Sequence, residues 1–73
     1  MHNALIPPAT LVVHAFGGVR SAARLLSCDA STVSRWQHTG RVPSSWQRRV
    51  LELAWSKGID LTAHDVIFGR EVV

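Results

Sequence analysis

Residues 19–38 read VRSAARLLSCDASTVSRWQH and hold two helical patterns on either side of a short polar turn. In the first pattern, over residues 19–26, the apolar side chains fall within about 160° of one helix face at about 100° per residue. Asp29 follows the turn and suits the N-cap of a second helix over residues 30–38, because its carboxylate can accept the free N–H groups of the first turn. The segment therefore predicts two consecutive helices joined by a tight turn.

The predicted helix over residues 30–38 has two contrasting faces. Val33 and Trp36 lie on one side, where they can anchor the helix in a core. The other side presents four hydrogen-bonding side chains within an arc of about 100° that contains no carboxylate, namely Ser31, Ser34, Arg35 and His38. Side chains of intermediate length that carry donors and acceptors are what the base edges in a DNA major groove require. This face indicates DNA recognition more than a merely solvated surface.

Glycine, proline and polar turns divide the rest of the chain into three further helical segments. Proline suits the first turn of the earliest segment, and Thr62 with Asp65 forms a capping pair before the last one. We expect the helices to span residues 8–16, 43–56 and 63–68, in addition to the two above. The sequence thus predicts an all-α, compact five-helix domain over residues 1–73, in which the tail 69–73 is either irregular or extended.

Composition narrows the function classes. The chain has 73 residues, 47% of them apolar, which suits one small domain without a deep catalytic cleft. One cysteine cannot form an internal disulfide, and the histidines match no metal-ligand spacing. The sequence has neither a run of 18 apolar residues nor a signal-peptide pattern. We expect a cytoplasmic protein that is not an enzyme and uses no membrane, cofactor, metal or small-molecule substrate.

The charge is unevenly distributed along the chain. Residues 20–49 carry six arginines and one aspartate, a net charge of +5, whereas residues 50–73 carry a net charge of −2. Seven of the eight basic residues are arginine, whose planar fork donates two parallel hydrogen bonds to phosphates or base edges. The middle of the chain is therefore the expected nucleic-acid contact.

Residues 22–36 resemble the helix-turn-helix of phage repressors and Cro proteins. Ala23, Cys28, Val33 and Trp36 match in register the small residue of the first helix, the position after the turn and the apolar anchors of the second helix. The upstream segment His14-Ala15-Phe16-Gly17 and the downstream segment Gly40-Arg41-Val42-Pro43 are similar to the all-helical branch of the Cro family, so the resemblance covers roughly residues 10–55. Its departure is Ser27, where the family usually has a glycine in left-handed conformation, and a serine there costs about 1 kcal/mol.

This resemblance implies a lambda-repressor-like, Cro-type fold and a specific mode of binding. Family members place the second helix of the motif in the major groove and bind as dimers to two half-sites. The positions that match base-reading residues are Ala30, Ser31, Ser34, Arg35 and His38, with Arg35 the strongest candidate because arginine to guanine is the commonest specific contact. Asp29 also matches a DNA-facing position, although we expect it to cap the helix. The positions expected to contact phosphates are Arg20, Ser21, Arg41 and Ser44. The implied function is a transcriptional repressor that occupies a pseudo-palindromic operator in double-stranded DNA as a homodimer.

The predicted helix over residues 43–56 leaves the dimer contact open. Its apolar residues span about 200°, which is wider than the stripe of about 100° that a single core contact requires. Trp46 and Trp55 lie on opposite sides of it. Either the helix is buried on two sides, or part of it joins a two-fold contact helped by the apolar tail. The candidate residues for that contact are Leu51, Trp55 and Phe68.

Two other functions stay open from the sequence. The chain can be a protein-interaction module or inhibitor that keeps the fold without binding DNA, although the basic middle segment argues against this. A single-strand or RNA binder needs exposed aromatic side chains on its basic face, whereas Trp36 and both phenylalanines are expected to point inward.

Overall fold

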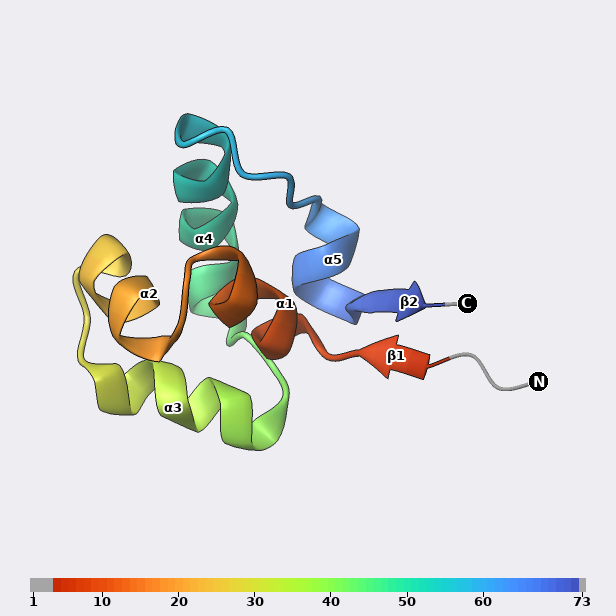
Figure 1. Cartoon of the computed structure of the whole chain (residues 1–73), viewed down its shortest axis with the longest axis horizontal. Coiled ribbons are helices and arrows are strands. Elements are labelled where there is room, and N and C mark those ends of the chain that lie inside the picture. The colour runs from red at the N-terminus through yellow and green to blue at the C-terminus, as the bar shows by residue number, and fades with distance from the viewer. Residues whose placement is uncertain (1–3, 73) are drawn as a thin grey trace.

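The computed structural model describes residues 4–72, which form five helices and two short strands (Figure 1). The elements follow in the order β1 (Ala4–Ile6), α1 (Pro8–Ala15), α2 (Val19–Leu26), α3 (Ala30–Thr39), α4 (Ser44–Ser56), α5 (Ala63–Phe68) and β2 (Arg70–Val72). The predicted helices are all present, and their ends agree with the expected ones to within one residue. The chain is thus mostly helical, as predicted.

Each helix contributes one side chain to the centre of a single core. The largest fully buried side chains are Val12, Leu26, Val33, Val50 and Val66, one from each of α1 to α5. Burying an aliphatic side chain of this size contributes about 1.5–3 kcal/mol to folding. In α4 the neighbouring Leu51 and Ala54 are buried as well, so this helix is central to the core. No single helix can leave the bundle without exposing part of this cluster.

A two-stranded sheet corrects the all-α prediction. β1 pairs with β2 in antiparallel register, with Ala4 opposite Val72 and Ile6 opposite Arg70. Gly69 makes the approach of the two segments possible, because its φ is +87° and a Cβ there would collide with the carbonyl oxygen of Ile6. An extended tail was one of the two conformations left open, but a strand at the N-terminal end was not predicted, since three residues are too few to show an alternating pattern.

Asp65 ties α5 to β2. Its backbone N–H donates to Thr62 Oγ1 at 3.1 Å, and its Oδ2 accepts from the Thr62 N–H at 3.1 Å, which confirms the predicted capping pair. Arg70 donates to the same carboxylate from Nε at 3.2 Å and from Nη2 at 2.5 Å. The Arg70 hydrogen bonds lower the pKa of this buried carboxyl group below its ordinary value, against the opposing effect of burial. The ion pair therefore joins the last helix to the sheet.

Candidate nucleic-acid interface

The outer face of α3 is exposed along its whole length, while its inner face is buried. Val33 is fully buried and Trp36 is 3% exposed. All five side chains predicted to read bases are exposed, namely Ala30, Ser31, Ser34, Arg35 and His38. No carboxylate lies among them. The predicted division of α3 into an apolar anchor and a polar outer face is confirmed as a placement of side chains. α3 lies along the lower edge of the molecule in Figure 1, with the other helices above it.

The turn before α3 has the left-handed backbone that the resemblance to the Cro family implied. Ser27 ends α2 with φ 57° and ψ 47°, and it is the one non-glycine residue with a positive φ among residues 4–72. The N–H of Cys28 reaches back to the carbonyl of Ala23 at 2.9 Å, which closes the end of α2. The left-handed residue sharply redirects the chain, so it sets the direction in which α3 leaves α2.

Asp29 is the N-cap of α3, but it does not cap in the way expected. Its backbone carbonyl accepts the first helical hydrogen bond from the N–H of Thr32 at 3.0 Å, while its carboxylate makes no capping hydrogen bond. The expectation of a side-chain cap is therefore wrong. Its negative charge still lies at the positive end of the helix dipole, where it is favourable.

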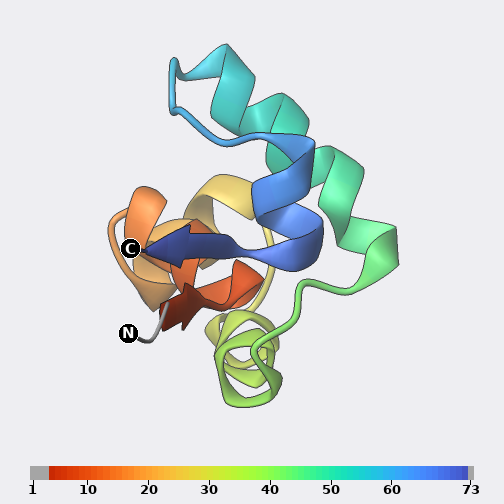
Figure 2. The same ribbon diagram turned by 90° about the vertical axis from the view of Figure 1, so that its right-hand side faces the viewer.

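The four predicted phosphate contacts lie on elements next to α3. Arg20 is exposed and Ser21 is half-buried in the first turn of α2, whereas Arg41 and Ser44 are exposed in the connection to α4 and at its first residue. Figure 2 views α3 nearly end on below the other helices, with α2 and the start of α4 above it on different sides. These four residues thus belong to elements beside α3 and not to α3 itself.

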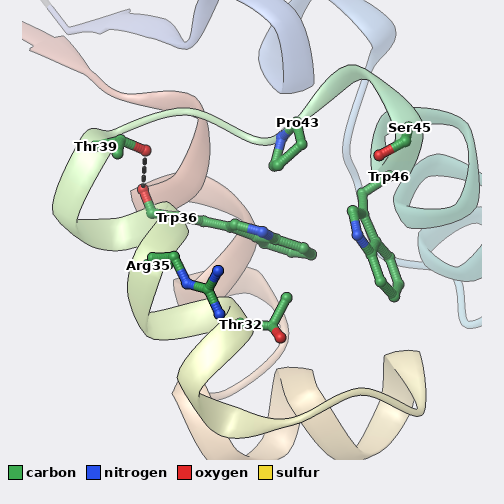
Figure 3. A pocket seen from close by; sticks show the side chains of 7 residues that line it. All are labelled: Thr32, Arg35, Trp36, Thr39, Pro43, Ser45 and Trp46. Atoms are coloured by element: carbon green, nitrogen blue, oxygen red, sulfur yellow. Dashed lines mark hydrogen bonds between the residues drawn. The ribbon is translucent and has the colours of Figure 1, made fainter.

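A hollow of about 300 Å³ opens between α3 and the start of α4 (Figure 3). Its lining comprises Thr32, Arg35, Trp36, Thr39, Pro43, Ser45 and Trp46. The rings of Trp36 and Trp46 meet at 5.4 Å between centroids and an angle of 56°, which is a favourable tilted arrangement. Arg35 therefore belongs to the outer face of α3 and also lines this hollow.

Sequence reasoning missed the role of Arg49. Its Cζ lies 5.2 Å from the centroid of the Trp46 ring, within the range of a cation–π contact. The spacing of three residues on one helix is the signal that points to this pair. Arg48 makes a different contact, an ion pair with Glu52 at 3.6 Å in which both side chains are largely exposed. Such an exposed pair contributes little to stability.

Cys28 lies half-buried at the start of the turn that leads into α3. Burial raises the pKa of its thiol above the ordinary value, although the nearby charge of Arg49 acts in the opposite direction. A thiol with a raised pKa is a weak nucleophile. The arrangement agrees with a packing role for this side chain.

The three side chains predicted at a dimer contact do not lie together. Leu51 is 9% exposed and packs into the chain's own core. The prediction that Leu51 takes part in a dimer contact is therefore wrong. Trp55 is 60% exposed in the last turn of α4, where its Nε1–H donates to the carbonyl of Leu61 at 2.9 Å. Phe68 is 63% exposed beside Leu5 and Ile67, so the expectation that both phenylalanines point inward is wrong for this one. The hollow that these three side chains line does not include Trp55.

Over residues 4–72 the structure places no three His, Cys, Asp or Glu side chains where they can hold a metal ion together. Within the same span, every helix is too short or too polar to cross a bilayer. Comparisons with protein-family models, curated proteins and solved structures find no match to this chain.

Proposed function

We propose that the chain is a sequence-specific regulator of transcription that binds double-stranded DNA through a Cro-like helix-turn-helix made of α2 and α3. The observation that carries the proposal is the outer face of α3, where Ser31, Ser34, Arg35 and His38 are exposed with no carboxylate among them. Donors and acceptors on a helix that lies along one edge of a small domain suit the base edges of a major groove.

The electrostatics of the same region support this proposal. The six arginines of residues 20–49 are all exposed, namely Arg20, Arg24, Arg35, Arg41, Arg48 and Arg49. Four of the five acidic residues of the chain lie after this segment. Such a distribution along the chain attracts a polyanion to the segment that includes α3, with an affinity that falls as salt rises.

In the proposed complex, α3 enters the major groove and Arg35 donates two hydrogen bonds to O6 and N7 of a guanine. Arg20 and Ser21 contact phosphates from α2, and Arg41 and Ser44 contact phosphates from the start of α4, which fixes the register of α3. Two copies on a pseudo-palindromic operator then repress transcription by excluding polymerase. This activity belongs in the cytoplasm of a bacterial or phage-infected cell.

A protein-interaction module is the second candidate function. The exposed apolar side chains Leu5, Ile67 and Phe68 favour it, because exposed apolar patches mark interaction sites. None of the three belongs to α3, and a DNA-binding assay separates the two functions.

The experiment is selection from a random duplex library, followed by anisotropy titrations of the selected duplex at two salt concentrations. We expect a defined consensus and an affinity that decreases as salt increases. Ser34→Glu places a carboxylate in the outer face and should abolish binding. Ser56→Glu adds the same charge at the last residue of α4 and should leave binding unchanged. Failure to bind any duplex even at low salt, with the fold intact by circular dichroism, rules out the proposal.

A further inference from the structure

The hollow between α3 and the start of α4 combines apolar walls with a cationic group. Its volume of about 300 Å³ lies at the lower end of the range of small-molecule pockets, about 300–1,000 Å³, so it admits one or two rings and not a peptide segment. Pockets of this kind are lined by apolar and aromatic surface with a few polar groups that orient the ligand, and they occur between the helices of bundles. The lining therefore indicates the class of molecule that fits.

Two indole rings form the apolar part of this lining. The ring of Trp46 is half-buried, and the ring of Trp36, with its centroid 5.4 Å away, is 3% exposed. Pro43 extends the same wall. An aromatic ring that displaces water from the half-buried indole gains burial and also the tilted or offset contact that aromatic pairs prefer. These walls favour a ligand with a flat aromatic body.

Arg35 supplies the charge of the hollow. Among the described residues it is the one charged side chain in the lining, and no carboxylate of residues 4–72 forms an ion pair with it. Its planar fork can donate two parallel hydrogen bonds to a carboxylate. The positive end of the α4 dipole adds to this field, because α4 begins at Ser44 without a side-chain cap. One guanidinium matches the single charge of a carboxylate better than a phosphate monoester, which carries about −1.5 to −2.

Two hydroxyl groups can complete the contacts of such an anion. The hydroxyl of Thr39 is already engaged, because it donates to the carbonyl of Trp36 at 3.2 Å and accepts from the N–H of Arg41 at 3.3 Å. Thr32 on α3 and Ser45 on α4 also line the hollow, and within the described chain their hydroxyls have no such bond. Figure 3 shows these two residues on the two helices that border the hollow. A carboxylate between the helices can therefore accept a hydrogen bond from each.

We propose that this hollow binds a small aromatic carboxylate, whose ring lies against Trp46 and whose carboxylate pairs with Arg35. The ligand then competes with DNA, because a guanidinium that donates to the carboxylate cannot also donate to O6 and N7 of a guanine. This second step rests on the proposed DNA-binding function, and through it the ligand releases the regulator from its duplex. The binding site itself does not depend on that function.

The first test is a nuclear magnetic resonance titration of the ¹⁵N-labelled full chain with 2-naphthoate, observed at the indole N–H groups. Trp36 and Trp46 line the hollow, whereas Trp55 does not line it and donates to the carbonyl of Leu61, so it is an internal control. We expect saturable shifts for Trp36 and Trp46 with a dissociation constant of about 1 mM or lower, and no shift for Trp55. The absence of a saturable shift up to about 10 mM overturns the proposal.

Three further probes test the charge and the ring separately. Naphthalene-2-carboxamide keeps the rings without the charge, inorganic phosphate carries charge without a ring, and cyclohexanecarboxylate keeps the carboxylate on a body that is not aromatic. The first two should bind about tenfold or more weakly than 2-naphthoate, and the third should also bind more weakly. Equal affinity for any of the three contradicts the proposed ligand class.

Variants test the residues that hold the ligand. Arg35→Gln should raise the dissociation constant of 2-naphthoate about tenfold or more, because it removes the charge that pairs with the carboxylate. Arg48→Gln is the matched control, since it removes the same charge from an exposed arginine outside the lining, and it should change the constant by less than about twofold. Ser45→Leu fills the hollow and should abolish binding. Circular dichroism reports on the fold of each variant, and equal effects of Arg35→Gln and Arg48→Gln overturn the proposal.

Competition with DNA tests the second step. At about ten times its dissociation constant, 2-naphthoate should weaken binding of the selected duplex about tenfold, and the same concentration of sodium chloride should weaken it less. Binding of both without competition overturns the release of DNA by the ligand. A chain that binds 2-naphthoate but no duplex supports the site and removes the proposed function, whereas a chain that binds the duplex but not 2-naphthoate does the reverse.

Discussion

The ring of Trp36 on the inner face of α3 packs against the ring of Trp46 in the first turn of α4, with centroids 5.4 Å apart. Trp36 is buried, and Trp46 is half-buried with Arg49 on its ring. This contact joins the helix that carries the outer face to the helix that is central to the core. It therefore holds α3 in place relative to the flanking arginines.

Truncation of Trp46 should loosen that connection. Trp46→Ala removes a half-buried aromatic ring and its contact with Trp36, so the free energy of unfolding should fall by about 2 kcal/mol. Trp55→Ala is the control: it removes an exposed ring with one hydrogen bond and should cost less than about 1 kcal/mol. Urea denaturation followed by far-ultraviolet circular dichroism measures both. Equal losses of unfolding free energy in the two variants would show that the Trp36–Trp46 contact does not stabilise the fold beyond the effect of removing an exposed ring.

The two classes of arginine contact should separate in DNA binding. Arg35→Ala should cost about 1–3 kcal/mol on the selected duplex and relax preference at one base pair, because it removes a bidentate base contact. Arg41→Ala should weaken binding to all duplexes alike and reduce the salt slope by about 1, because it removes a phosphate contact. Competition against single-base variants of the duplex measures both effects. A uniform loss for Arg35→Ala would contradict its assignment to base reading.

The turn between α2 and α3 should tolerate, and prefer, glycine. Ser27 has φ 57°, where a side chain is strained, so Ser27→Gly should raise the free energy of unfolding by about 1 kcal/mol. Ser27→Ala keeps the Cβ and the strain and should change stability little, which makes it the matched control. Thermal and urea denaturation give the values. A loss of stability in Ser27→Gly would mean that the serine hydroxyl contributes more than the strain removes.

Asp65 should make stability depend on pH in the acid range. Its folded pKa is lowered, mainly by the Arg70 hydrogen bonds, so the stabilisation is fully present above the ordinary carboxyl pKa of about 4 and is lost as the pH falls through the lower folded value. Arg70→Gln should shrink this dependence, because the guanidinium that favours the ionised form is gone. Urea denaturation at a series of acid pH values tests the effect. An unchanged acid profile in Arg70→Gln would show that the ion pair does not set it.

Local signals were sufficient to place the helices and the two faces of α3. A proline at the first turn, a capping pair and an apolar spacing of three or four residues act within a few residues of each other, so they can be seen in the sequence. The strained backbone of Ser27 was expected from the resemblance to the Cro family, not from local signals. Local reasoning failed for the carboxylate of Asp29, because the N-cap position does not compel the side chain to make the hydrogen bond.

Tertiary contacts decided the rest. The pairing of β1 with β2 and the proximity of Leu5 to Phe68 bring together segments that are far apart in the chain. The burial of Leu51 depends on which side of α4 the core covers. The sequence does not distinguish an apolar residue that its own chain buries from one that stays exposed on the surface. Periodicity thus reveals that a face is apolar, whereas only the packed arrangement shows what covers it.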